Sequence, residues 1–132
     1  MTFDQVRENG GRLFEIWQQR GKEIYVDLPD ADARSITATL LGCGCRVAAV
    51  FAEDRTRAED RFNVYYVFDN PEDPRYLLAR VPVAADTRTF PSLAAEIPAV
   101  NWQEREIQDW FGLIAEGHPN PRRVALHGAP AG

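Results

Sequence analysis

Residues 101–112, which read NWQEREIQDWFG, are the most informative stretch of the chain. Asn101 is a favoured N-cap residue, and Glu104 stands three positions later, where a capping-box carboxylate can reach back. Gly112 is suited to end the helix in a left-handed conformation. Four apolar side chains recur at helical spacing: Ile107, Trp110, Phe111 and Ile114. They would form one broad buried face, so the stretch predicts a capped amphipathic helix.

The same helix carries charges on its other faces. Arg105 and Asp109 are four positions apart and can pair. Glu104 and Glu106 point in different directions, so they do not form a carboxylate pair for acid–base chemistry. We expect capping and ion pairing from Glu104, and buried or interfacial pairing from Arg105 and Glu106. A helix with this density of aromatic bulk and charge suits contacts on more than one side.

The residues after this helix predict an extended tail. Residues 116–123 read EGHPNPRR, and residues 115–132 have no apolar period and contain three prolines, so they cannot form a helix of their own. Arg122 and Arg123 could bind a phosphate. Guanidinium groups on an extended tail are also favoured at protein interfaces, and this is the preferred interpretation.

The two segments together resemble the signature of the thirty-kilodalton subunit family of respiratory complex I, an NADH dehydrogenase. The same domain occurs in membrane-bound nickel–iron hydrogenases and formate hydrogenlyase. The sequence departs from the family pattern at Trp110, where an aliphatic residue is more usual, and at Asn120-Pro121, which replaces Asp-Leu. The residues that match the signature or would lie at the interface are Glu104, Arg105, Glu106, Asp109, Phe111, Gly112, Glu116, Gly117, His118, Pro119, Arg122 and Arg123.

The resemblance implies a non-catalytic structural or assembly subunit that carries no cofactor and no metal. It implies docking on a large subunit, of the forty-nine-kilodalton type or the nickel–iron hydrogenase type, and contact with other subunits of the hydrophilic arm. Electron transfer to quinone or protons would take place in the neighbouring subunits. Association with the inner face of the cell membrane would be indirect, through the complex.

Composition bounds the other possibilities. The chain has 132 residues and a net charge of −5, so it is long enough for one folded domain and lacks the basic surface of a non-specific nucleic-acid binder. No apolar run is long enough to span a bilayer. The N-terminus lacks the basic and apolar regions of a signal peptide, so we expect a cytoplasmic location.

Hydrophobic periodicity predicts an α+β fold, with a four-stranded mixed or antiparallel sheet and helices on one face. The expected strands cover residues 23–28, 46–52, 62–68 and 76–83. The second of these is apolar on both sides and is therefore expected at the centre of the sheet, and Pro82 is expected at an edge or bulge. The expected helices cover residues 3–21, with a capping box from Thr2 to Gln5 and a possible break at Gly10-Gly11, then 30–42, 91–97 and 101–112. Residues 1–114 would form one domain, followed by the tail.

Two other classes of function are compatible with the residues. A stand-alone small metal-dependent enzyme would use the tail residues Glu116, His118 and His127, but their spacing fits no familiar ligand pattern. A soluble regulator without a fixed partner is the other alternative. Cys43 and Cys45 could form a redox pair or half of a shared metal site. They fit better as two small residues at a helix-to-strand turn around Gly44.

Overall fold

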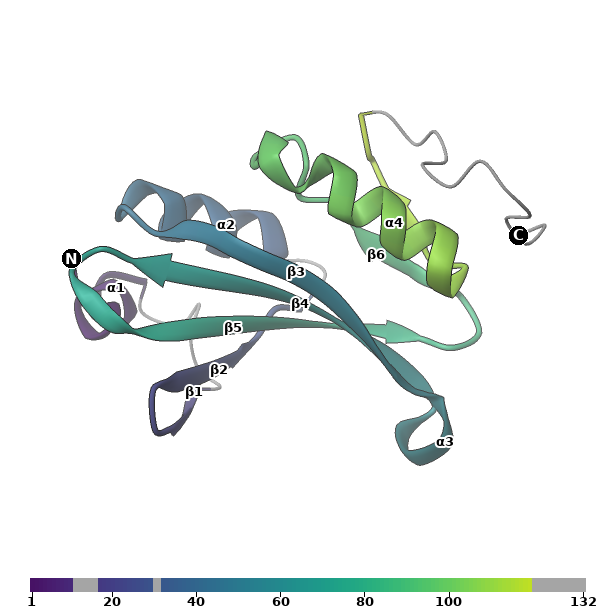
Figure 1. Ribbon diagram of the computed structural model, residues 1–132, viewed down its shortest axis with the longest axis horizontal. Helices are drawn as coiled ribbons and strands as arrows, with labels where there is room; N and C mark the ends of the chain where they lie inside the picture. Colours follow the sequence, from purple (N-terminus) through teal and green to yellow (C-terminus); the bar gives the residue numbers. More distant parts are fainter. Residues whose placement is uncertain (11–16, 30–31, 120–132) are drawn as a thin grey trace.

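The computed structural model describes residues 1–10, 17–29 and 32–119 of the chain (Figure 1). The main sheet is mixed. Its strands stand in the spatial order β1 (Trp17–Arg20), β2 (Glu23–Asp27), β5 (Asp73–Ala84), β4 (Arg61–Asn70) and β3 (Arg46–Arg55). Strands β2 and β5 run parallel, and the other neighbours are antiparallel. The α+β class and the mixed sheet predicted from the sequence are therefore confirmed, with one strand more than expected.

The additional strand, β1, replaces the second half of the helix expected for residues 3–21. Helix α1 covers only Phe3–Gly10, and β1 pairs with β2 as an antiparallel hairpin. Gly21 does not end a helix but lies in the hairpin turn with φ +58°, a conformation that glycine adopts at little cost. The predicted capping box is present, because Thr2 N–H donates to Gln5 Oε1 (2.8 Å) and Gln5 N–H donates to Thr2 Oγ1 (3.3 Å).

Helix α2 (Ala33–Gly42) buries Ala33, Ile36 and Leu40, which recur at helical spacing. Side chains along strand β4 alternate between the two faces of the sheet. Phe62, Val64, Tyr66 and Phe68 are part of the core that includes residues of α1 and α2. The intervening residues Asn63, Tyr65 and Val67 point to the other face, because successive side chains of a strand alternate. The core therefore lies between the helices and one face of the main sheet.

The position predicted for residues 46–52 was wrong. Strand β3 is at the edge of the sheet and not at its centre. Its apolar residues do not require two covered faces, since Ala48 and Ala49 are small and exposed and Phe51 stacks on Tyr65 of the neighbouring strand. The connection between β3 and β4 is short, because the two strands extend to either side of helix α3 (Thr56–Glu59).

Pro82 lies in the part of β5 that pairs with β4 but extends beyond the end of β2. The last residue pair between β2 and β5 is Asp27 with Arg80, while β4 continues to pair with β5 through Asn63 and Pro82. A proline there needs no hydrogen-bond partner on the β2 side, in agreement with the predicted local edge.

The segment expected as a helix over residues 91–97 is not helical. Strand β6 (Thr89–Pro91) is followed by turns and by the short 3₁₀ helix η2 (Pro98–Val100), which leads into α4 (Asn101–Phe111). After α4, strand β7 (Ile114–Glu116) returns and pairs in parallel with β6. Residues 115 and 116, the first residues of the expected tail, are therefore strand residues, and Ala115 is buried.

Candidate subunit interface

Helix α4 presents two chemically different faces. With 3.6 residues per turn, Glu104, Ile107 and Phe111 fall on one side, and Trp102, Arg105, Glu106, Asp109 and Trp110 fall on the other. Glu104 and Ile107 are buried, and Phe111 is partly buried against the core. The signature is thus divided between an inner face, which the fold itself covers, and an outer face.

The inner face is organised around Glu104, whose side chain is fully buried. Tyr66 Oη–H donates to Glu104 Oε2 at 2.6 Å, and Ser92 Oγ–H donates to Oε1 at 2.6 Å. The backbone N–H of Leu93 donates to Oε2 at 2.8 Å. A buried carboxylate needs such donors because it has lost its hydration. Glu104 therefore links β4, the turn after β6 and α4, and the capping role expected for it was wrong.

No side chain of the described residues caps the start of α4. The N-cap position is Val100, and Asn101, the expected cap, is the first helical residue. His118 lies over this end of the helix. It is buried, with its Nε2 3.2 Å from the carbonyl oxygen of Asn101 and 3.9 Å from Glu104 Oε1.

Burial, together with the negative charge of Glu104, raises the pKa of the Tyr66 hydroxyl well above its ordinary value, so Tyr66 stays a hydrogen-bond donor to Glu104.

The end of α4 matches the prediction. Gly112 has φ +67°, and its N–H donates to the carbonyl oxygen of Gln108 at 3.0 Å. Gln108 Oε1 accepts from the N–H of Ala115 at 2.9 Å, which joins the helix to β7. Arg88 Nη1 donates to the carbonyl oxygen of Phe111 at 3.3 Å, and its guanidinium lies over the Phe62 ring at 5.3 Å. A cation at the C-terminal end of a helix also complements the helix dipole.

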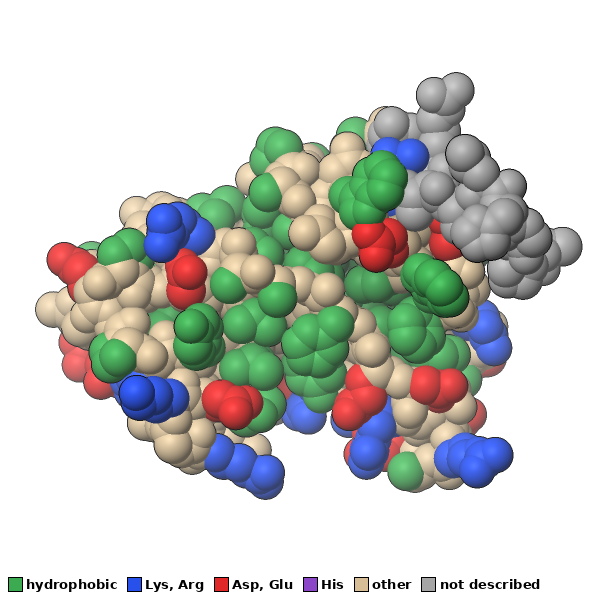
Figure 2. Space-filling model, viewed as in Figure 1, with side chains coloured by type: hydrophobic (Ala, Val, Ile, Leu, Met, Phe, Trp, Pro, Cys, Tyr) green, Lys and Arg blue, Asp and Glu red, His purple; other side chains and the backbone are tan. Residues whose placement is uncertain are grey.

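The outer face of α4 is aromatic and charged. Trp110 is 74% exposed, Trp102 is 56% exposed, and Ile114 on the adjoining β7 is 54% exposed. The prediction that Trp110 and Ile114 belong to the buried face was therefore wrong, because only Ile107 and Phe111 point inward. The Arg105 guanidinium lies over the Trp102 ring at 5.6 Å. Figure 2 shows hydrophobic side chains next to acidic ones on the surface over α4, in the upper right of the view.

The remaining signature residues follow β7. The Glu116 side chain is exposed, and its carbonyl oxygen accepts from Ser92 N–H at 2.9 Å. Gly117 has φ +81°, a backbone conformation that favours glycine, and a Cβ there would come within 2.8 Å of the flexible end of Arg34 at Nη2. Pro119 is exposed. Arg122, Arg123 and His127 lie outside the described residues.

Sequence reasoning missed three residues of this region, Tyr66, Ser92 and Gln108. Tyr66 and Ser92 satisfy Glu104, and Gln108 ties α4 to β7. Alternation identifies Tyr66 only as a strand residue, and Ser92 falls in a predicted helix that does not form. No spacing in the sequence connects them with Glu104, because the contacts span 38 and 12 residues.

Metal and thiol chemistry finds little support in the described part of the chain. Among these residues, no group of three or more His, Cys, Asp or Glu side chains is placed to hold a metal ion. Cys43 and Cys45 are free thiols at the turn between α2 and β3. Burial, and to a smaller extent the neighbouring Cys43 thiol, raises the pKa of Cys45 to about 11. This thiol is therefore protonated at neutral pH and is a poor nucleophile.

Comparison with known proteins identifies the family. Residues 26–130 match the family described as respiratory-chain NADH dehydrogenase, 30 Kd subunit. The chain belongs to this family. The resemblance drawn from the signature is thereby confirmed.

Relatives in this family come from two kinds of complex. The chain is 33% identical over 81 residues to formate hydrogenlyase subunit 5 of Escherichia coli (strain K12), which covers 61% of this chain and 14% of that protein. It is 34% identical over 119 residues to the C/D subunit of NADH-quinone oxidoreductase from Bdellovibrio bacteriovorus, which covers 86% of this chain and 20% of that protein. The chain thus spans a fifth or less of the length of both relatives.

A solved structure supports the fold. The trypsin-resistant fragment (1–134) of Nqo5 superposes with a TM-score of 0.68 at 22% identity, covering 89% of this chain and 95% of the fragment. Within the described residues of this family member, no helix has the length and apolar character needed to cross a membrane.

Proposed function

We propose that this family member is an accessory subunit, or the corresponding domain of a longer subunit, of a complex-I-like NADH:quinone oxidoreductase or a related membrane-bound hydrogenase. Its role is assembly: it contributes no catalytic group and docks on the large subunit of the hydrophilic arm. The names of its relatives support this, since one is a subunit of formate hydrogenlyase and another a subunit of NADH-quinone oxidoreductase. In the relative named C/D, the region similar to this chain is one-fifth of a longer polypeptide, which fits a domain that works beside a larger partner.

The observation that carries the docking proposal is the outer face of α4. The fold accounts for the inward-facing residues of α4, because Glu104, Gln108 and Phe111 hold the helix against the sheet and β7. It does not account for two tryptophans that are more than half exposed on the same helix. Large aromatic side chains bury roughly 150–250 Å² each when covered and are enriched at the centres of protein interfaces. The outer face therefore has the composition of a surface that a partner covers.

The charged signature residues extend this surface. Arg105, Glu106 and Asp109 are half-buried beside the tryptophans, where charges can set the orientation of a partner. Arg122 and Arg123 belong to the same proposal through the family signature, as residues that would continue the contact along the large subunit. The alternative of a stand-alone metal enzyme is disfavoured, because His118 is buried against the start of α4.

Co-expression tests the assembly role. The tagged chain is expressed with the large subunit encoded in its own genome, either of the complex I type or of the nickel–iron hydrogenase type. We expect one large subunit per chain after affinity purification and gel filtration, and oxidoreductase activity only in the assembled complex. The type of large subunit that co-purifies decides between the two kinds of complex. Failure of both types to co-purify, or full activity of the isolated chain, would contradict the proposal.

A further inference from the structure

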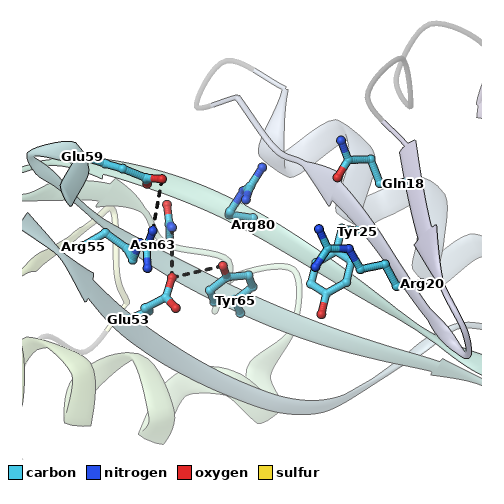
Figure 3. A pocket seen from close by; sticks show the side chains of 9 residues that line it. All are labelled: Gln18, Arg20, Tyr25, Glu53, Arg55, Glu59, Asn63, Tyr65 and Arg80. Carbon is cyan, nitrogen blue, oxygen red and sulfur yellow. Dashed lines mark hydrogen bonds and ion pairs between the residues drawn. The ribbon is translucent and has the colours of Figure 1, made fainter.

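The main sheet has a second surface that the core does not use. On the face opposite the core, a groove of about 240 Å³ crosses the sheet. Its lining comes from all five strands and from α3, and Figure 3 shows these side chains on the side of the sheet away from α4. Glu53, Asn63 and Tyr65 lie together at one end of the groove, and Arg20 and Tyr25 lie across from them.

Most charged groups of the groove are already paired. Arg80 Nε and Nη2 both lie 2.7 Å from Asp27 Oδ1. Arg55 Nη2 lies 3.4 Å from Glu59 Oε1. These two guanidiniums therefore bring little unbalanced positive charge to the groove.

Glu53 is different. The partly buried carboxylate receives only neutral donors, Asn63 Nδ2 and Tyr65 Oη, each at a long 3.3 Å. Among the described residues, no cationic group lies within ion-pair distance of it. A half-buried carboxylate without a cation or a short hydrogen bond has lost hydration without full compensation.

Asn63 adds a second unsatisfied acceptor. The residue is 2% exposed, and its Oδ1 receives no hydrogen bond from any residue that the structure describes. Asn63 Nδ2 donates to Glu53. If the amide were flipped, Oδ1 would face the carboxylate and two acceptors would meet. The contact with Glu53 therefore fixes Oδ1 on the side away from the carboxylate. The side chains of Arg55 and Glu59 near it are 42% and 38% exposed and can move aside. Among the described residues, the Glu53 carboxylate therefore has no cationic partner and the Asn63 oxygen has no donor, and that oxygen becomes reachable once Arg55 and Glu59 move aside.

We propose that this groove receives an arginine side chain from a partner protein, held by Glu53 and Asn63. A guanidinium has five donors in a planar fork, which can serve a carboxylate and an amide oxygen together. Its flat face can stack on aromatic rings, and Tyr65 and Phe51 supply a stacked pair at 4.9 Å beside these acceptors. The partner being a neighbouring subunit rests on the proposed function. The groove is a contact separate from the outer face of α4.

Nuclear magnetic resonance of the isotope-labelled chain tests the inference. The probe is Nα-acetyl-arginine amide, and its matched control is the neutral isostere Nα-acetyl-citrulline amide. We expect saturable shifts of the Asn63 side-chain amide and of backbone amides near Glu53 and Tyr65 with the arginine probe alone. Glu53→Gln should weaken the apparent affinity by roughly tenfold or more, because a charge-assisted hydrogen bond is lost. The control Glu8→Gln, at an exposed residue of α1 outside both surfaces, should leave it unchanged.

Three results would overturn the inference: no saturable shift in the groove, equal shifts with the citrulline control, or unchanged affinity in Glu53→Gln. Saturable shifts around Arg20 with inorganic phosphate, and none with arginine, would identify an anion site instead and would also overturn it. The citrulline comparison uses the unaltered chain, so it decides even if Glu53→Gln fails to fold. Because the probe replaces the partner, failure here is distinguishable from failure to bind the large subunit.

Discussion

Glu104 is a signature residue whose hydrogen bonds hold the fold together. It sits where a reactive carboxylate could be imagined, yet three donors from separate parts of the chain occupy its oxygens. Removing one partner from a buried, charged hydrogen-bond group is more costly than the net worth of the bond, because the remaining donors are left unpaired. The residue is best understood as the connection that fixes α4 on the sheet.

This role predicts a stability effect. Glu104→Gln keeps the shape of the side chain but replaces one acceptor with an NH₂ group that faces a donor. We expect the free energy of unfolding of the isolated chain to fall by about 2–4 kcal/mol, measured by urea denaturation. Glu106→Gln, on the outer face of the same helix, is the matched control, and it should stay within about 0.5 kcal/mol because this side chain is only partly buried. Equal effects of the two substitutions would show that Glu104 is not a structural connection.

At the scale of the element, α4 illustrates what a sequence pattern can and cannot predict. The helix, its end at Gly112 and the inward positions of Ile107 and Phe111 follow from spacing. The orientation of Trp110 does not, because an apolar residue at helical spacing reads the same whether the fold or a partner covers it. The parallel pairing of β6 and β7 is equally invisible, since it joins short segments on opposite sides of η2 and α4 that carry no strand pattern.

The same limit applies to the sheet. Alternation predicts the four long strands, but apolar content alone placed residues 46–52 at the centre, and β3 is an edge. The short β1 could not be separated from a helix because Trp17 continues the helical spacing. The candidate site was predicted as a set of residues by family resemblance, whereas its division into inner and outer faces required the three-dimensional arrangement.

Neighbouring aromatics of α4 provide a prediction at this scale. Phe111 packs edge-on against Phe62 with ring centroids 6.2 Å apart, so Phe111→Ala should lower the free energy of unfolding by about 2–4 kcal/mol, somewhat less than full burial would give. Trp110→Ala should change it by less than about 0.5 kcal/mol, because the side chain is mostly exposed. Thermal melts of both variants compare the two directly. A large loss in Trp110→Ala would place this tryptophan in the core.

At the scale of the whole molecule, one face of the main sheet packs against the core, and two other surfaces carry groups that the fold itself does not cover or pair. The outer face of α4 exposes aromatic area, and the groove of the sheet holds an amide oxygen that no described residue serves as donor. Such surfaces support the proposed role of a subunit that other proteins cover. The two surfaces lie on different sides of the molecule, which suits a subunit that touches more than one neighbour.

The most direct test of docking through the outer face of α4 uses the double variant Trp102→Ala, Trp110→Ala of this chain. The measured quantity is the dissociation constant of its complex with the large subunit. Because exposed tryptophans contribute little to folding, its thermal melt should match the unaltered chain. Because buried interfacial tryptophans typically contribute about 2 kcal/mol or more each, the dissociation constant should rise by roughly thirtyfold or more, the effect expected of even one of them. Tyr76→Ala, an exposed aromatic of β5 outside both surfaces, should change neither quantity. An unchanged dissociation constant with an unchanged melt would contradict docking through this helix.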